Sequence, residues 1–387
     1  YYVYFGTNAS ADPVTAGSFQ VSTDYYSLEP LNSGTYYFIL KTQDESGNVS
    51  SASTLFTYIY SGLENISYSV EDTSEFEEGS LTNVSASNNE LSLLHREAFW
   101  MEKGVEASPR SFYSADAMAY VQSNNKIYKF EGNNQRRFYE YDVSGNLWTE
   151  LSTAPDTVYY GGSLTDGPDG YLYAFRGYNS ISFWRYDIAN NTWSDDSATD
   201  PSQTVYYGGD LQYDGERYIY AIRGNNDDTF WRYDTQSDIW EDLPATDYGS
   251  PTYQSANTNY IGADLAYDGV GTIYAMQGGS RTGFASYDTN SETWTRLPNV
   301  PYGAYYGGSI EYVEDENAIY CITGNYRPYF FKYDIENREW STLKDLPYYA
   351  YHGADIKLVG DLLYIHRGNG NMMYIYDPAK ETWLLPD

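Results

Sequence analysis

Short runs of aromatic and β-branched residues, separated by small polar clusters, recur through the last two thirds of the chain. The segment 206–240 shows the pattern completely: its apolar runs at 218–222 and 230–233 are bounded by Asp214-Gly215 and by residues 224–226. Runs bounded in this way by Gly, Asn and Asp are typical of β-strands joined by tight turns. The segment therefore predicts four short strands and three turns.

The same pattern occurs six times, and each copy contains a Tyr-Asp pair followed six residues later by Trp. Successive tyrosines are 45, 47, 54, 46 and 43 residues apart, a period typical of stacked supersecondary units. A hairpin centred between Tyr and Trp places them directly opposite each other, where aromatic pairs stabilise a sheet by ~0.2–1 kcal/mol. The predicted pairs are Tyr141 with Trp148, Tyr186 with Trp193, Tyr233 with Trp240, Tyr287 with Trp294, Tyr333 with Trp340, and Tyr376 with Trp383.

Each copy also has an apolar strand that ends in glycine, such as residues 219–224. Together with the Tyr-Asp pair, the later Trp and a Pro-containing loop, this order resembles the repeat of kelch-type β-propellers. The resemblance covers residues 106–387 and implies an all-β ring of four-stranded blades. Because six regular copies end at Trp383, we expect a six-bladed ring. The alternative is that residues 78–113 add a degenerate seventh blade or one closing strand.

One position departs from the kelch pattern, in which two glycines follow the apolar strand. The first glycine is replaced in every copy, and three copies carry Arg176, Arg223 and Arg367 there. Buried arginines generally have carboxylate partners. The favoured interpretation is therefore an ion pair within the blade, with an Asp of a Tyr-Asp unit. The alternative is a polar ring that holds a ligand in the central channel.

The first 60 residues follow a different pattern. Strand-like runs occur at 1–6, 18–23 and 36–43, and residues 31–50 resemble the later part of a fibronectin type III or similar Ig-like domain. Such a sandwich needs about seven strands, so the strands that should precede residue 1 are missing. The expected fold is an incomplete Ig-like sandwich in front of the propeller.

An incomplete sandwich leaves an unpaired strand edge, which proteins avoid exposing. We expect this assembly edge at Tyr1, Val3 and Phe5. Residues upstream of the sequence would complete the sandwich, or a strand donated by a neighbouring subunit would do so. Donation between subunits would produce a head-to-tail homopolymer.

Residues 61–105 are rich in Ser, Asn and acidic side chains. They predict a solvated linker with one or two strands, at 81–84 and 91–94. The expected organisation is thus a partial fibronectin type III or Ig-like domain at 1–60, a linker at 61–105 and a propeller at 106–387.

Charge and composition limit the partners. The formal net charge is −32, which argues against nucleic acid, and no apolar run approaches the ~18–20 residues that a membrane-spanning helix needs. The single cysteine, Cys321, has no partner for an internal disulfide. We therefore expect a secreted or cell-surface protein without membrane insertion. Its candidate glycosylation sites are Asn8, Asn48, Asn65, Asn83 and Asn190.

Tyrosine is unusually frequent, with 47 among 387 residues. Aromatic pairs recur just before the first strand of a repeat, at positions that lie near one channel mouth in proteins resembling this one. We expect Tyr160, Tyr207, Tyr306 and Tyr351 to bind a glycan or a protein loop there. The alternative is that these rings only pack the inner strands together. Binding requires the first three to be partly exposed in one pocket.

Catalytic motifs are weak. His352, His366 and Cys321 fall in the last two repeats, and copper oxidases that resemble kelch propellers use two histidines, two tyrosines and a cysteine. No tyrosine arrangement in the sequence completes that set, and no nucleophile elbow, Walker loop or zinc motif occurs.

The expected function is therefore non-enzymatic: extracellular or surface binding, in adhesion, a surface layer or a filament, with a protein or glycan partner. We expect no catalytic residue, cofactor or metal. The alternative is a secreted carbohydrate-active enzyme or a galactose-oxidase-like oxidase with an accessory Ig-like module.

Overall fold

The computed structural model describes residues 2–16, 18–19, 26–27, 34–41, 53–60, 66–69, 81–87, 90–95, 106–112, 118–195, 198–249 and 257–384. The chain divides into two compact units, residues 1–103 with 386–387, and residues 104–385. Strands dominate both units. In the described ranges α1 (Pro13–Ala16) is the single α-helix, and no helix there is long and apolar enough to span a membrane.

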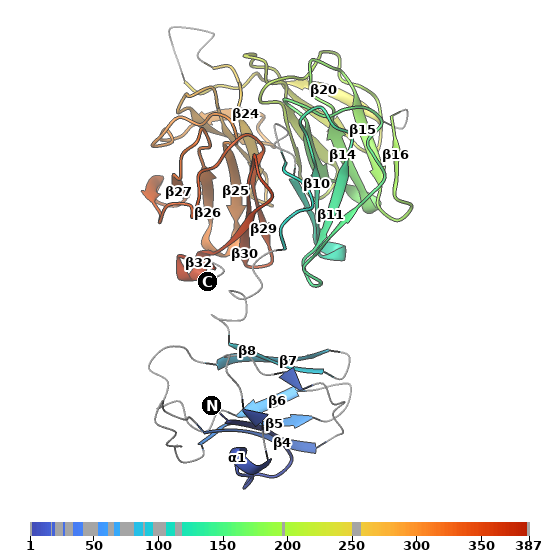
Figure 1. Ribbon diagram of the computed structural model, residues 1–387. Helices are drawn as coiled ribbons and strands as arrows, with labels where there is room; N and C mark the ends of the chain where they lie inside the picture. Colours follow the sequence, from blue (N-terminus) through green and yellow to red (C-terminus); the bar gives the residue numbers. More distant parts are fainter. Residues whose placement is uncertain are drawn as a thin grey trace. The chain divides into compact units, whose positions relative to one another are not determined.

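The second unit consists of six antiparallel sheets, each made of four consecutive strands (Figure 1). Blade one contains β9 (Met118–Val121), β10 (Lys126–Phe130), β11 (Phe138–Asp142) and β12 (Leu147–Glu150). Blade two contains β13 (Ser163–Asp166), β14 (Tyr171–Phe175), β15 (Phe183–Asp187) and β16 (Thr192–Ser194). Blade three contains β17 (Asp210–Tyr213), β18 (Tyr218–Ile222), β19 (Phe230–Asp234) and β20 (Ile239–Leu243).

The remaining three blades repeat this order. Blade four contains β21 (Asp264–Tyr267), β22 (Thr272–Met276), β23 (Phe284–Asp288) and β24 (Thr293–Arg296). Blade five contains β25 (Ser309–Val313), β26 (Ala318–Ile322), β27 (Phe330–Asp334) and β28 (Glu339–Thr342). Blade six contains β29 (Ala354–Val359), β30 (Leu362–Arg367), β31 (Met373–Asp377) and β32 (Thr382–Leu384).

The blades close into a ring. The first strands of successive blades pack side by side, and β29 of the last blade packs against β9 of the first. The six-bladed propeller is therefore confirmed, and the seventh-blade alternative is wrong. Residues 106–112 instead contribute one isolated β-bridge, between Phe112 and Gly370. The other five junctions between neighbouring blades each have an equivalent bridge.

The repeated Tyr and Trp pair as predicted. Tyr186 lies opposite Trp193 in the register of β15 and β16, and the other five pairs do the same. The turn between them is constant too, because the residue five positions after the Tyr is left-handed in all six copies, for example Asn191 at φ 52° and Asp238 at φ 59°. Five residues separate the Tyr-Asp pair from the Trp, and this turn places the two rings in contact.

The indole N–H of each of these tryptophans also donates a hydrogen bond to a backbone carbonyl in the loop that leads into its own blade. Trp240 Nε1 donates to the Thr199 carbonyl at 2.7 Å, and Trp193 Nε1 donates to the Ser152 carbonyl at 3.1 Å. The remaining four make the equivalent bond. Trp240 further packs on Phe175 and Phe183 of the preceding blade. The pattern visible in the sequence thus joins blades as well as strands.

The first unit has two sheets. The larger, in the order β2-β1-β4-β5-β6, contains β1 (Tyr2–Gly6), β2 (Ser18–Phe19), β4 (Gly34–Lys41), β5 (Ser53–Tyr60) and β6 (Ile66–Ser69). The smaller, in the order β3-β8-β7, contains β3 (Tyr26–Ser27), β7 (Leu81–Ser87) and β8 (Glu90–His95).

Two expectations for this region need correction. Residues 61–105 contain three strands, not one or two, and β6 and β8 pair with β5 and β3 of the first 60 residues. They are part of the first unit and not a separate linker. The expected edge is not open at Val3, which is buried and pairs with Ser18 and Leu40.

Phe5 pairs with Phe38, whereas Tyr1 lies outside the described residues. The fibronectin type III or Ig-like assignment stays a prediction.

Candidate functional site

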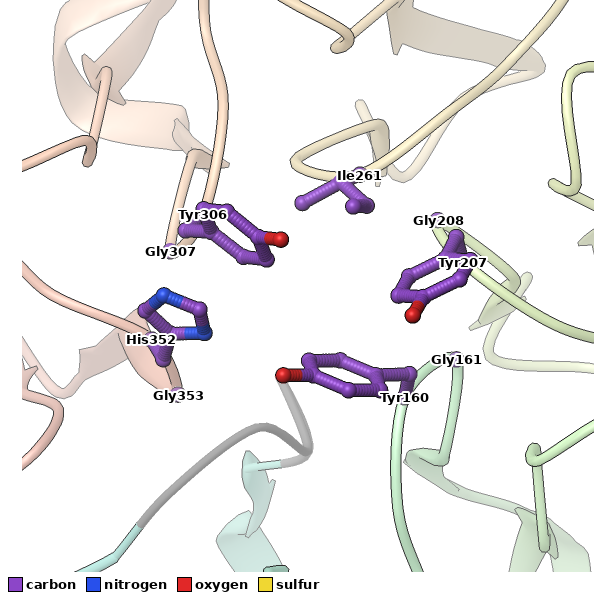
Figure 2. A pocket seen from close by; sticks show the side chains of 9 residues that line it. All are labelled: Tyr160, Gly161, Tyr207, Gly208, Ile261, Tyr306, Gly307, His352 and Gly353. Carbon is purple, nitrogen blue, oxygen red and sulfur yellow. The ribbon is translucent and has the colours of Figure 1, made fainter.

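One side chain from each of five blades meets at a pocket on the propeller axis (Figure 2). The pocket is small, with an enclosed volume of about 10 Å³, and the lining glycines Gly161, Gly208, Gly307 and Gly353 each follow one of the lining side chains. The five side chains, which we call the aromatic mouth, are Tyr160, Tyr207, Ile261, Tyr306 and His352. The corresponding segment of blade one falls at residues 113–117, outside the described part.

The glycine after each mouth residue has a specific backbone conformation. Gly161, Gly208, Gly262, Gly307 and Gly353 all have φ between +74° and +79°, a region that glycine adopts without steric cost. A Cβ on Gly208 would overlap the carbonyl group of Tyr260 in the next blade. This turn lets adjacent blades approach closely and directs the preceding side chain toward the axis, as Figure 2 shows.

The rings of the mouth contact one another across blades. The centroids of Tyr160 and Tyr207 are 4.7 Å apart, and Tyr160 lies 6.2 Å from both Tyr306 and His352. Tyr306 and His352 are stacked, with centroids 3.5 Å apart and an interplanar angle of 19°. In Figure 2 the hydroxyls of Tyr207 and Tyr306 face the centre of the opening.

Tyr207, Tyr306 and His352 are uncharged near neutral pH. Contact with the Tyr206 hydroxyl, together with burial, raises the pKa of Tyr207, and burial raises the pKa of Tyr306. Burial lowers the pKa of His352 below 6.5. The site therefore offers aromatic faces, phenol hydroxyls and a neutral imidazole.

The structure places the predicted mouth residues as follows. Tyr160, Tyr207 and Tyr306 are half-buried and line one pocket, the arrangement that binding requires. Tyr351 does not line it, because the adjacent His352 takes the position before the glycine. Sequence reasoning missed His352 and Ile261. The signal that identifies them is the residue immediately before the first glycine of each repeat.

A second set of tyrosines surrounds the mouth. Tyr159 packs on Tyr160 at 4.1 Å, and Tyr351 packs on Tyr326 at 4.5 Å. Tyr178 and Tyr326, in the turns between the second and third strands of their blades, are 45% and 49% exposed. An aromatic surface therefore extends outward from the pocket, and exposed surfaces of this kind are typical of binding sites.

Buried carboxyl groups lie on the inner strands that follow the mouth. Asp210, Asp264 and Asp355 each accept a hydrogen bond from a backbone N–H group of a first strand in another blade. The donors are Leu265 N at 2.9 Å, Ile310 N at 2.6 Å and Met118 N at 2.7 Å. Because buried N–H groups need acceptors, these aspartates have a structural role at the joints between blades.

Ser309 connects two of these carboxyl groups. Its Oγ is 2.8 Å from Asp264 Oδ2 and 2.9 Å from Asp355 Oδ1. A hydroxyl has one proton to donate, so at least one of the two contacts needs a carboxyl proton. Burial accordingly raises the pKa of Asp264, and it raises the pKa of Asp210 to about 6.

A second layer deeper in the ring pairs Lys357 Nζ with Glu311 Oε2 at 3.4 Å. Glu311 also accepts from Leu358 N of the next blade at 2.9 Å. In the described ranges no group of three or more His, Cys, Asp or Glu side chains is arranged to hold a metal ion.

The three arginines have contacts outside the pocket. Arg176 pairs with Asp156 at 3.0 Å, and Arg223 pairs with Asp227 at 2.7 Å. These carboxylates belong to loops and not to Tyr-Asp units, so the predicted partner is wrong although the ion pairs exist. Arg367 lies over the rings of Tyr348 and Tyr351, at 5.4 and 5.3 Å. None of the three lines the pocket.

The residues considered for an oxidase have separate environments. Cys321 is fully buried with its Sγ 3.6 Å from Met276 Sδ, and burial raises the pKa of its thiol. His366 is also buried and packs on the ring of Phe112 at 4.9 Å. Unlike these two, His352 lies in the mouth. Cys321 and His366 therefore do not line the mouth with His352.

Of the candidate glycosylation sites, Asn8 and Asn190 are exposed, and Asn190 Nδ2 donates to Asp187. Asn83 lies in β7, whereas Asn48 and Asn65 are outside the described residues. Their modification stays a prediction.

Comparison with known proteins identifies the fold. No protein-family model and no curated protein sequence matches the chain. Among 1168 matching solved chains is one described as "Structure of YjhT", with a TM-score of 0.54 and 13% sequence identity. The match covers 70% of this chain and 96% of that one. At this identity the likeness shows the propeller fold alone and carries no information on activity.

Proposed function

Starting from this propeller scaffold, we propose that the protein is a non-enzymatic binding protein and that the aromatic mouth is its binding surface. The observation that carries the proposal is the convergence of five side chains from five blades on one solvent-open pocket. Rings that served only to pack the inner strands would have no need of hydroxyl groups, yet three of the five are tyrosines. Aromatic rings with polar ends are enriched at binding surfaces.

The chemistry of the mouth favours binding over catalysis. Its lining contains no carboxylate, thiol or aliphatic hydroxyl, and its imidazole stacks on Tyr306 instead of facing a nucleophile. An acid–base pair or an activated nucleophile would be needed for hydrolysis. The enzyme alternative therefore has no arrangement of residues in the mouth to support it.

The proposed setting is extracellular or at the cell surface, in adhesion, a surface layer or a filament. The net charge of −32 and the exposed sequons Asn8 and Asn190 support this setting. In the same proposal the first unit contacts a neighbouring subunit or a partner, and a protein or glycan occupies the mouth.

The test is a binding screen with variants of one blade. The full chain would be applied to glycan arrays and to surface proteins, together with Tyr306→Ala and the matched control Tyr312→Ala. Tyr312 lies near the other end of β25, the strand that follows Tyr306. We expect Tyr306→Ala to lose the bound partner and Tyr312→Ala to keep it. Equal binding by both variants would show that the mouth is not the binding surface.

A further inference from the structure

We infer that the aromatic mouth selects a small organic cation, namely an alkylammonium group presented by a free amine or by a lysine side chain. This inference rests on the proposed function and adds the class of ligand. Three observations carry it: the aromatic faces, the hydroxyl oxygens, and the sign of the charge behind them.

The aromatic rings come from four blades and line the opening. Tyr160, Tyr207, Tyr306 and His352 lie with neighbouring centroids between 3.5 and 6.2 Å apart. A cation within ~6 Å of a ring centroid is attracted by the negative face of the ring, and clustered aromatic rings recognise ammonium groups in this way. The enclosed space at the mouth is about 10 Å³, close to the volume that holds one water molecule. It therefore suits the head of one small functional group and not a whole oligosaccharide.

The hydroxyl oxygens supply acceptors. A primary ammonium group has three N–H donors and no acceptor, whereas a phenol oxygen accepts as well as donates. The hydroxyls of Tyr207 and Tyr306 face the centre of the opening in Figure 2. They can receive an ammonium group without any change in their own protonation.

The charge behind the mouth is negative. Asp210, Asp264 and Asp355 each stand three residues after a mouth residue, at Tyr207, Ile261 and His352. The base Lys357 is paired with Glu311, and its charge also interacts with Asp355, Asp264 and Asp210. The buried layer behind the mouth therefore sets four carboxyl groups against one ammonium group.

Two of the three arginines near the mouth are neutralised by carboxylates: Arg176 is paired with Asp156 and Arg223 with Asp227. Arg367 lies over the rings of Tyr348 and Tyr351. The molecule as a whole carries a formal charge of −32. An anionic ligand would be repelled, and a neutral sugar would gain nothing from this field.

The experiment titrates the full chain with probes that differ in charge but not in shape, observed by calorimetry or by tyrosine NMR signals. The probes are n-butylammonium, its neutral analogue 1-butanol, choline, and Nα-acetyl-lysine amide. The proteins are the wild type, Tyr160→Ala, Tyr207→Ala and the control Tyr312→Ala. We expect n-butylammonium to bind the wild type roughly tenfold more tightly than 1-butanol, and the two mouth variants to lose this preference.

Comparison of the probes shows whether the ammonium group belongs to a protein side chain or to a free amine, and whether the mouth binds cations at all. Tighter binding of Nα-acetyl-lysine amide than of n-butylammonium identifies a protein side chain as the source, and the reverse identifies a free amine. Equal binding of n-butylammonium and 1-butanol overturns the cation inference. Cation binding that Tyr160→Ala and Tyr207→Ala leave unchanged also overturns it, because general attraction to an acidic protein would explain the signal.

Failure of the proposed binding function can be distinguished from failure of the cation inference. If a glycan or protein partner is lost in Tyr306→Ala while no ammonium probe competes for the mouth, the binding proposal stands and the cation inference falls. If neither partners nor probes respond to the mouth variants, both fall.

Discussion

At the scale of single residues, the protonation of buried aspartates and the backbone angles of glycines determine how neighbouring blades of the propeller are joined. Ser309 contacts Asp264 and Asp355 with one hydroxyl proton between them, and Asp210 lies in hydrogen-bond contact with Asp264. These contacts require at least one protonated carboxyl group inside the ring. The same three aspartates accept the backbone N–H groups that join the blades, so their protonation and the stability of the ring are linked.

This linkage predicts how stability depends on pH. Burial raises the folded-state pKa of Asp210 to about 6 and also raises the pKa of Asp264, from an ordinary value of 3.8 for each. A carboxyl group whose pKa is higher in the folded state stabilises fully below its unfolded pKa. That stabilisation is lost as the pH rises through the folded pKa. We expect the unfolding free energy from these groups to fall between about pH 4 and about pH 7.

Asp264→Asn tests the prediction because an amide mimics the protonated carboxyl. Its oxygen can still accept from Ile310 N and its N–H can face Asp210. We expect the loss of unfolding free energy between these pH values to shrink by about 1–3 kcal/mol relative to the wild type, measured by urea unfolding. The exposed control Asp361→Asn should keep the wild-type pH profile. An unchanged profile in Asp264→Asn would contradict the shared proton.

The glycines of the mouth give a second residue-scale prediction. Gly208 has φ +78° and no room for a Cβ, whereas Gly215 of the same blade has φ +79° and nothing within 4 Å of a Cβ. Alanine at Gly215 measures the cost of the backbone angle alone, about 1 kcal/mol. Alanine at Gly208 adds the overlap with the Tyr260 carbonyl. We expect it to cost at least about 2–3 kcal/mol in urea unfolding. Equal costs would show that the close approach of the blades is unimportant.

At the scale of elements, the hairpin that pairs Tyr with Trp also joins blades. The Trp240 indole packs on Tyr233 and on two rings of the preceding blade, and its N–H donates to the Thr199 carbonyl. A sheet with one face on each neighbour buries both faces, which explains why the clusters of buried residues run between blades. Each repeat of the Tyr–Trp pattern therefore corresponds to one interface between neighbouring blades.

Replacing one indole tests the joint. We expect Trp240→Phe to lower the unfolding free energy by about 1–3 kcal/mol, because one hydrogen bond and part of a packed ring are lost. Hydrogen exchange at the Thr199 segment should become faster in the variant. Ile239→Ala, at an exposed position of the same strand, should change stability by less than about 0.5 kcal/mol. Similar losses in both variants would mean that β20 as a whole, and not the indole, is responsible.

At the scale of the whole propeller unit, the ring is closed by residues 106–112 and by two inner strands. Phe112 is fully buried against Tyr139, Trp148 and His366, and it bridges Gly370 of blade six. Asp355 accepts from Met118 N across the same joint. A segment that precedes the first repeat thus completes the last one.

We expect removal of the Phe112 phenyl ring to destabilise mainly the junction between blades one and six. We expect Phe112→Ala to cost about 3–5 kcal/mol, with faster hydrogen exchange in β9 and β31 than in blades three and four. Val158→Ala, at the matching position of an internal joint, should cost less because it removes two carbon atoms and not a six-carbon ring. Exchange that rises evenly in all six blades would contradict a role specific to closure.

The spacing of Tyr, Asp and Trp determined the blades by itself, because a hairpin with a fixed turn places those residues opposite each other whatever surrounds them. The same repeated order of residues placed Tyr160, Tyr207 and Tyr306 before the inner strands. Local patterns could not show that His352 replaces Tyr351 in the pocket, or that Arg176 and Arg223 pair with loop carboxylates, since those contacts join separate segments. They also could not show that residues 66–95 add strands to the first unit.

Only the tertiary structure decided where the carboxyl groups meet. Asp210, Asp264 and Asp355 are unremarkable residues in their own strands, and they become one buried cluster because ring closure brings six inner strands around a single axis. Periodicity along the chain is a local property that the sequence carries in full. The proton held between Asp264, Ser309 and Asp355 is a property of three blades at once, and no single segment contains it.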